Sequence, residues 1–177
     1  MRTPLLSPGA AALCILACAA AFAGSAAAAA PSVEKLPDGS TVTVSQSGQV
    51  VHRDRAGAVL AESSCGSPAA YRARVRVLTA FRTAVLAGDR GAAASLVAYP
   101  LAWNRGVPPD RRTLRDRAAL LRSWDKVFLP GVVRLIRSAN PRAVFCKNAT
   151  QFTLGPGVVW GDTAGGRAAI AIVNSFG

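Results

Sequence analysis

The chain has 177 residues, and its 21 lysines and arginines against 9 aspartates and glutamates give a formal net charge of +12. This length favours one ordinary domain, and a composition that is 51% apolar and 17% charged excludes a collagen, a coiled coil and a fully disordered protein. Four cysteines are too few for a dense disulfide scaffold.

Residues 1–30 have the layout of a secretory signal peptide. Arg2 is the only charged residue before Glu34, an apolar run follows from residue 10 to residue 23, and small residues come after it. A positive start, a short apolar core and an A-x-A-like exit are the parts of such a signal. We therefore predict export, with cleavage between residues 23 and 30 and a periplasmic or secreted location. Removing Arg2 with the signal leaves a formal charge of +11.

A lipid anchor is the alternative interpretation of the same segment. Cys18 ends the sequence Ile-Leu-Ala-Cys, which loosely resembles a bacterial lipoprotein box. In that case Cys18 is lipidated and the alanine-rich stretch after it is a tether that holds the protein in the bacterial envelope.

Residues 31–64 predict a small β ribbon. Three short runs, at 41–44, 49–53 and 58–61, are separated by turns at Gly48 and Gly57, and an earlier turn ends at Gly39. Such a ribbon is marginal alone, so we expect it to pack on the rest of the chain.

Helices are predicted next, starting after Cys65. Ser67 suits a helix N-cap and Pro68 the first helical position, and an apolar stripe follows as far as Gly88. Asp89 and Asp116 are predicted caps of two further helices, at 90–97 and 117–126. A short strand is expected at 101–103, a loop at 106–110, and a last helical piece at 132–138, after a helix break at 129–131.

The C-terminal part turns to β structure, with candidate strands at 143–146, 151–154, 158–160 and 167–173. Helices followed by a meander predict an α+β fold for residues 65–177, in which N-terminal helices pack on an antiparallel sheet.

This order resembles the nuclear transport factor two-like superfamily, which includes SnoaL-like and ketosteroid-isomerase proteins. The resemblance rests on GDRGAAASLVAYPL (88–101), WDKVF (124–128), GPGVVW (155–160) and residues 170–174, and it covers residues 68–174. It implies a curved sheet wrapped by helices around a cone-shaped pocket. It implies no activity, because that fold hosts enzymes, binders and assembly modules. Isomerases of this type place a carboxylate base after the second helix, where this chain has none between Tyr99 and Asn104.

If such a pocket exists, large aromatic residues are expected at its wall. Burial in the core is the simpler alternative for the aromatic residues. For Asp125, which follows Trp124, the simpler alternative is a salt bridge with an arginine. The predicted pocket-wall residues are Tyr99, Trp103, Trp124, Asp125 and Trp160.

Cys65 and Cys146 are predicted to form a disulfide, because export exposes them to an oxidising compartment and no C-x-x-C spacing favours a redox thiol. His52 is the single histidine and falls on the ribbon, so the sequence predicts no catalytic triad. A metal site needs three or four converging ligands. We therefore assign no catalytic, cofactor-binding or metal-binding residues.

Arginines cluster between residues 111 and 122. The absence of interleaved aromatics, together with export, argues against nucleic acid as the partner. Two interpretations stay open: solvated helix faces, and a surface for an anionic partner such as an acidic exported protein or an envelope component. The cluster contains Arg111, Arg112, Arg115, Arg117 and Arg122.

Three functions remain open at this stage. The first is an exported, non-catalytic binding module for a protein or a small ligand. The second is a periplasmic immunity or inhibitor protein that neutralises a toxin or hydrolase by surface complementarity. The third is a pocket enzyme of the ketosteroid-isomerase type, which needs a carboxylate or tyrosine with a perturbed pKa facing the pocket.

Overall fold

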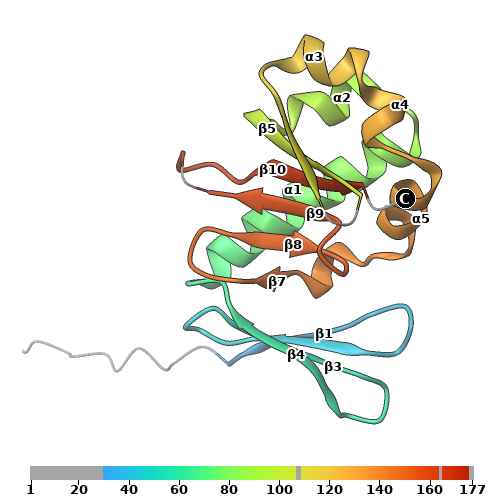
Figure 1. Cartoon of the computed structure of the whole chain (residues 1–177). Helices are drawn as coiled ribbons and strands as arrows, with labels where there is room; N and C mark the ends of the chain where they lie inside the picture. Colours follow the sequence, from blue (N-terminus) through green and yellow to red (C-terminus); the bar gives the residue numbers. More distant parts are fainter. Residues whose placement is uncertain (1–29, 107–108, 164, 176–177) are drawn as a thin grey trace, which may run out of the picture.

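The computed structural model describes residues 30–106, 109–163 and 165–175. Two β-sheets are joined by helices, which confirms an α+β protein (Figure 1). The predicted signal peptide and Cys18 lie outside the described residues, apart from Ala30. No helix in the described part of the chain is long and apolar enough to cross a membrane.

The first sheet is the predicted ribbon, with four antiparallel strands in the order β1-β2-β3-β4. Val42, Val44 and Val50 are buried on one face of it. One strand more is present than the sequence predicted, because the side chains of β1 are mostly exposed and leave no apolar alternation. The strands are β1 (Ser32–Lys35), β2 (Thr41–Val44), β3 (Gln49–Arg53) and β4 (Val59–Ser64).

The turn between β2 and β3 joins this ribbon to the rest of the protein. Gly48 has a φ of +78°, and a Cβ on it would lie 2.2 Å from the backbone nitrogen of Ser67. The backbone N–H of Cys65 donates to the carbonyl of Gly48 at 2.8 Å. Only glycine permits both the positive φ and this close approach.

Of the five α-helices in the described residues, three begin at the caps that the sequence predicts. The side chains of Ser67, Asp89 and Asp116 each accept a backbone N–H three residues later. The helices are α1 (Pro68–Leu86), α2 (Arg90–Ser95), α3 (Arg117–Arg122), α4 (Trp124–Val127) and α5 (Pro130–Ser138).

Two helix predictions are wrong in detail. The helix expected at 117–126 is divided at Ser123 into α3 and α4. The predicted helix break is present, since α4 ends at Val127, but α5 begins at Pro130 and not at residue 132, because proline fits the first turn of a helix, where no intrahelical N–H is required.

The second sheet has six strands in the order β6-β5-β10-β9-β8-β7. Strand β10 is antiparallel to β9 but parallel to β5, so the sheet is mixed and the prediction of a wholly antiparallel sheet is wrong. A parallel pair needs a long crossover, and the chain between β5 and β10 contains α3, α4 and α5 as well as the other four strands of the sheet. A 3-10 helix, η1 (Pro141–Ala143), precedes β7. The strands are β5 (Val97–Arg105), β6 (Asp110–Leu114), β7 (Phe145–Cys146), β8 (Phe152–Leu154), β9 (Val159–Asp162) and β10 (Ala169–Ser175).

Strand β6 is the largest departure from the sequence prediction, which expected a loop and then helical structure there. Its sequence, Asp-Arg-Arg-Thr-Leu, has a single apolar residue, and only Leu114 is buried. Pairing with β5 defines the strand, because Leu101 lies opposite Leu114 and Arg105 opposite Asp110. Helix α1 lies across one face of the sheet, where it buries Leu78 and Phe81 (Figure 1).

Candidate functional site

Two predicted pocket-wall residues fill the space between the sheet and the helices. Trp103 is 3% exposed, and its indole N–H donates to Ser175 Oγ at 3.0 Å. The Ser175 hydroxyl in turn donates to the carbonyl of Val127 in α4. Trp124 is also buried and stacks on Phe128 with 4.1 Å between ring centroids. These contacts make Trp103 and Trp124 part of the packed interior.

Trp160 lies on the opposite face of the sheet. Trp103 is paired with Val173 of β10, whereas Trp160 is paired with Ile172, the preceding residue on the same strand. Successive residues of a strand point to opposite faces, so the register separates the two tryptophans. The Trp160 indole is half-buried and donates to the carbonyl of Gly157 at 3.0 Å.

The other two predicted pocket-wall residues have local partners. The Tyr99 hydroxyl donates to the carbonyl of Ala94 at 3.1 Å, and burial raises the pKa of Tyr99. Asp125 is exposed and forms an ion pair with Arg90 at 2.8 Å, the simpler role that the sequence allowed for it. The structure therefore does not gather the five predicted residues around one space.

An open cleft of about 450 Å³ lies elsewhere, between the ribbon and the helices. Pro37 and Asp38 of the β1–β2 turn line one side, and Thr79 and Arg82 of α1 are among the residues of the other. None of the predicted pocket-wall residues lines this cleft.

The single histidine contacts a serine near the cleft. His52 Nε2 lies 3.1 Å from Ser40 Oγ, and the Ser40 hydroxyl donates to Asp38 Oδ1 at 2.6 Å. In a catalytic triad, the serine hydroxyl donates its proton to the histidine. Here the Ser40 hydroxyl donates to Asp38 instead, so it is not arranged as a nucleophile. The hydrogen bonds from Ser40 lower the pKa of Asp38. In the described residues, no three histidines, cysteines or carboxylates lie close enough to hold a metal ion.

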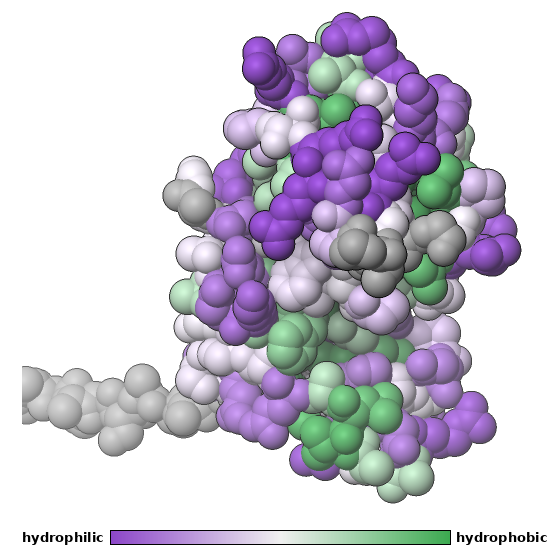
Figure 2. Space-filling model, viewed as in Figure 1, coloured by the Kyte–Doolittle hydropathy of each residue, from purple (hydrophilic) through white to green (hydrophobic). Residues whose placement is uncertain are grey.

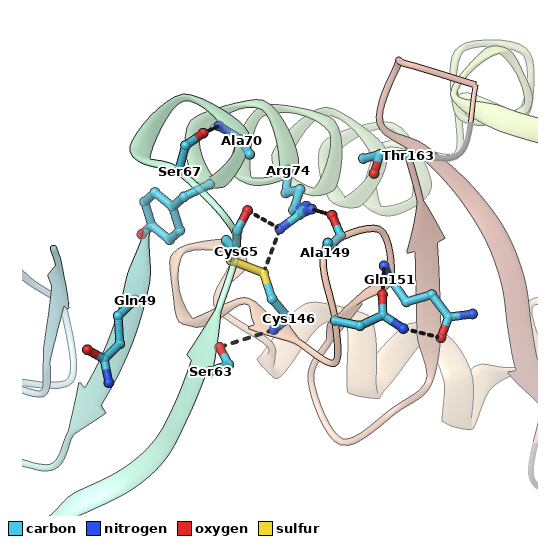
Figure 3. The surroundings of a disulfide bond; sticks show 12 residues. Gln49, Ser63, Cys65, Ser67, Ala70, Arg74, Cys146, Ala149, Gln151 and Thr163 are labelled. Carbon is cyan, nitrogen blue, oxygen red and sulfur yellow. Dashed lines mark hydrogen bonds between the residues drawn. A yellow bond between two sulfur atoms is a disulfide. The ribbon is translucent and has the colours of Figure 1, made fainter. Parts of the chain in front are cut away.

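The predicted disulfide between Cys65 and Cys146 is confirmed, with 5.3 Å between the two Cα atoms (Figure 3). It joins the chain just after β4 to strand β7, and both cysteines are buried. The backbone N–H of Cys146 also donates to Ser63 Oγ at 3.2 Å. The bridge therefore holds the ribbon against one edge of the six-stranded sheet.

A buried arginine lies against this disulfide. Arg74 of α1 is 1% exposed and donates to the carbonyl of Cys65 at 2.9 Å and to Cys146 Sγ at 3.1 Å (Figure 3). A third bond goes to the carbonyl of Ala149. Burial lowers the pKa of the Arg74 guanidinium, and the negative charge of Asp162 acts in the opposite direction.

Arg74 is not among the site residues that the sequence predicts. Its position in the sequence nevertheless indicates burial, because Arg74 lies three residues after Tyr71 and four before Leu78, on the apolar face of the helix. A charged residue on such a face is buried only when polar partners are provided. Those partners come from the bridged segments, which helix periodicity cannot reveal.

The five clustered arginines are all exposed and lie on neighbouring elements. Arg111 and Arg112 are in β6, Arg115 is in the link after it, and Arg117 and Arg122 are in α3. The expectation of helix faces is therefore wrong for Arg111 and Arg112. We call these five residues the arginine surface. Figure 2 shows hydrophilic residues gathered over the β5–β6 hairpin.

Two of these arginines have partners within the chain. Arg112 forms an ion pair with Asp110 at 2.8 Å and lies 5.8 Å from the centroid of the Trp103 ring, whereas Arg117 donates to the carbonyl of Gly91 at 3.2 Å. Within the described residues, no side-chain hydrogen bond or ion pair involves the remaining three, Arg111, Arg115 and Arg122. Three exposed guanidinium groups of the cluster therefore have no side-chain partner among the described residues.

No protein-family model, no curated protein and no solved structure matches this chain. The two candidate sites, the arginine surface and the disulfide with Arg74, are therefore defined by the geometry and chemistry of their own residues.

Proposed function

We propose that this protein is an exported binding module whose arginine surface engages an anionic partner outside the cytoplasm. The observation that carries the proposal is the set of three exposed arginines, Arg111, Arg115 and Arg122, without an internal partner. A guanidinium group offers a planar set of donors that fits a carboxylate or a phosphate. Their summed charge also increases the rate at which an anionic partner associates.

Two further features support export and a non-catalytic role. A disulfide such as Cys65–Cys146 forms and persists in oxidising compartments, which agrees with the signal-like residues 1–30. The packed aromatic interior around Trp103 and Trp124 favours a binding surface over a pocket enzyme. A cone-like member of the nuclear transport factor two-like superfamily would also have helices followed by a sheet. Membership of that superfamily is therefore part of the proposal.

An immunity or inhibitor protein is the specific form of this function in which the partner is one acidic toxin or hydrolase. The same arginine surface would then supply the charge complementarity, and binding would be tight and sensitive to salt.

The test is affinity capture from the exported proteins of the source cells, using the oxidised protein as bait. The site variant is Arg111→Gln/Arg115→Gln/Arg122→Gln. The control variant, Arg72→Gln/Arg76→Gln/Arg134→Gln, removes the same charge from three other exposed arginines that also lack partners in the described residues. We expect one acidic protein to be recovered in stoichiometric amount, and its recovery to fall at least tenfold with the site variant only. Equal recovery by the two variants would contradict the proposal.

A further inference from the structure

Strand β6, which carries Arg111 and Arg112 of the arginine surface, forms a free edge of the six-stranded sheet. It is the terminal strand in the sheet order, and among the described residues it pairs with β5 alone. Residues 110–113 are all exposed. In the described part of the chain, no backbone hydrogen bond joins β6 to any segment other than β5.

A free edge of this kind presents backbone donors and acceptors at alternate residues. An extended polypeptide matches this spacing, because it can add to the sheet as another strand. Lipid headgroups and envelope polymers can neutralise arginines, but they have no backbone ladder to offer. The edge and the charge together therefore select a polypeptide with acidic side chains.

The arginines determine which polypeptide would fit. Arg111 and Arg112 point to opposite faces of the sheet, because they are successive residues of one strand. Arg112 is already held by Asp110, so Arg111 within β6 and Arg115 just after the end of the strand are the arginine side chains available to an added strand. Side chains directly opposite on paired strands approach within about 5 Å at Cβ, where a carboxylate would pair with arginine and another cation would be repelled.

The other exposed edges lack this combination. Strand β7, at the far end of the same sheet, has two residues and is tied to the ribbon by the disulfide and by Ser63. Strands β1 and β4 of the ribbon are also terminal. The charged residues of β1 are one acid and one base, and Glu34 is paired with Arg142, whereas the single charged residue of β4 is the acidic Glu62.

We infer that the partner contributes an extended acidic segment, which adds to β6 as a further strand of the sheet. This inference rests on the proposed function, and it specifies the chemistry of the partner and the way it binds. The backbone edge of β6 would supply the hydrogen bonds, and Arg111 and Arg115 would select acidic side chains in the added strand.

A synthetic peptide tests this inference directly. The probe is the capped, fluorescently labelled heptapeptide Glu-Val-Glu-Thr-Glu-Val-Glu, and its control carries N-methyl groups on two adjacent central residues. The control has the same charge, but each of its two edges has lost a hydrogen-bond donor. We expect the probe to bind at least tenfold more tightly than the control, and to slow amide hydrogen exchange in β6. Arg111→Glu should weaken binding at least tenfold, and Arg72→Glu, on exposed α1 surface, should leave it within twofold.

The outcomes separate this inference from the proposed function. Equal binding of the two peptides with no protection of β6 would overturn strand addition, while the arginine surface would still account for partner capture. Tight binding to phosphatidylglycerol vesicles with no binding of either peptide would overturn the polypeptide partner. Loss of arginine-dependent capture, by contrast, contradicts the proposed function itself.

Discussion

The two edges of the six-stranded sheet differ in what covers them. At the β7 edge, a two-residue strand is bridged to the ribbon by the disulfide, and the buried Arg74 donates to both bridged segments. At the β6 edge, a five-residue strand is exposed, and the guanidinium groups of Arg111 and Arg115 have no partner among the described residues.

Arginine therefore serves two purposes in this protein, and burial decides between them. The two Nη groups of Arg74 donate to carbonyl groups and to a sulfur atom of the same chain, so they contribute to the fold, whereas its buried Nε has no hydrogen-bond partner among the described residues. Those of Arg111, Arg115 and Arg122 are solvated and remain available to another molecule. We expect stability to depend on the first edge and recognition on the second.

The largest loss of stability should follow removal of the bridge at the closed edge. The Cys65→Ser/Cys146→Ser variant frees a loop closed over a sequence separation of 81 residues. Chain entropy then lowers the free energy of unfolding by about 4 kcal/mol. Urea unfolding of the oxidised protein and the variant measures the difference, and a loss below about 1 kcal/mol would show that the bridge contributes little.

Replacement of Arg74 should have the next largest effect. Arg74→Met keeps much of the side-chain volume but leaves the carbonyls of Cys65 and Ala149 without their donor. We expect a loss of about 3 kcal/mol in the free energy of unfolding, because the carbonyl of the buried Cys65 is then unsatisfied. The matched control is Arg72→Met, an exposed arginine on the same helix, which should change stability by no more than about 0.5 kcal/mol. Equal effects of the two substitutions would show that the hydrogen bonds of Arg74 do not stabilise the fold.

The closed edge was partly predictable from the sequence, and the open edge was not. Cys65 and Cys146 were paired correctly, because redox chemistry and an even count constrain them. Likewise, the helix caps Ser67, Asp89 and Asp116 were found because capping is local chemistry. Strand β6 was missed because pairing with β5 defines it, and four of its five side chains are polar and exposed.

The candidate site shows the same division between local and non-local information. The arginine cluster was visible in the sequence, but whether its members lay on helices or on a sheet edge depended on the fold. Trp160 and Trp103 are separated because they pair with successive residues of β10. This register depends on which strands pair with β10, and the sequence of one strand does not specify its partners.

A smaller, pH-dependent effect should arise at Tyr71, near the closed edge. Its hydroxyl donates to the carbonyl of Arg142 at 2.9 Å, and burial followed by the charge of Glu34 raises the pKa of Tyr71 to about 12. The folded protein then holds the proton more tightly than the unfolded chain, whose tyrosine pKa is about 10, so this contribution is lost as the pH rises from 10 to 12. We expect the contribution of Tyr71 to the free energy of unfolding to be about 1 kcal/mol smaller at pH 11 than at pH 9.

The Tyr71→Phe variant provides the control for this dependence. Phenylalanine cannot ionise, so the difference in stability between the protein and the variant should shrink between pH 9 and pH 11, although other groups titrate in both. A difference that stays constant over this range would contradict the raised pKa.

The smallest effects are expected at the open edge, where two adjacent arginines of β6 should behave differently. Arg112→Gln removes the ion pair with Asp110 and the contact with the Trp103 ring, which together contribute about 0.5–1 kcal/mol at an exposed site. Arg111→Gln removes no internal contact and should leave stability within about 0.5 kcal/mol of the original protein. Thermal unfolding with peptide binding distinguishes the two roles: Arg112→Gln should lower Tm more, and Arg111→Gln should weaken the acidic peptide more. The reverse order would mean that the β6 edge belongs to the folding scaffold, as the β7 edge does, and that recognition lies elsewhere on the molecule.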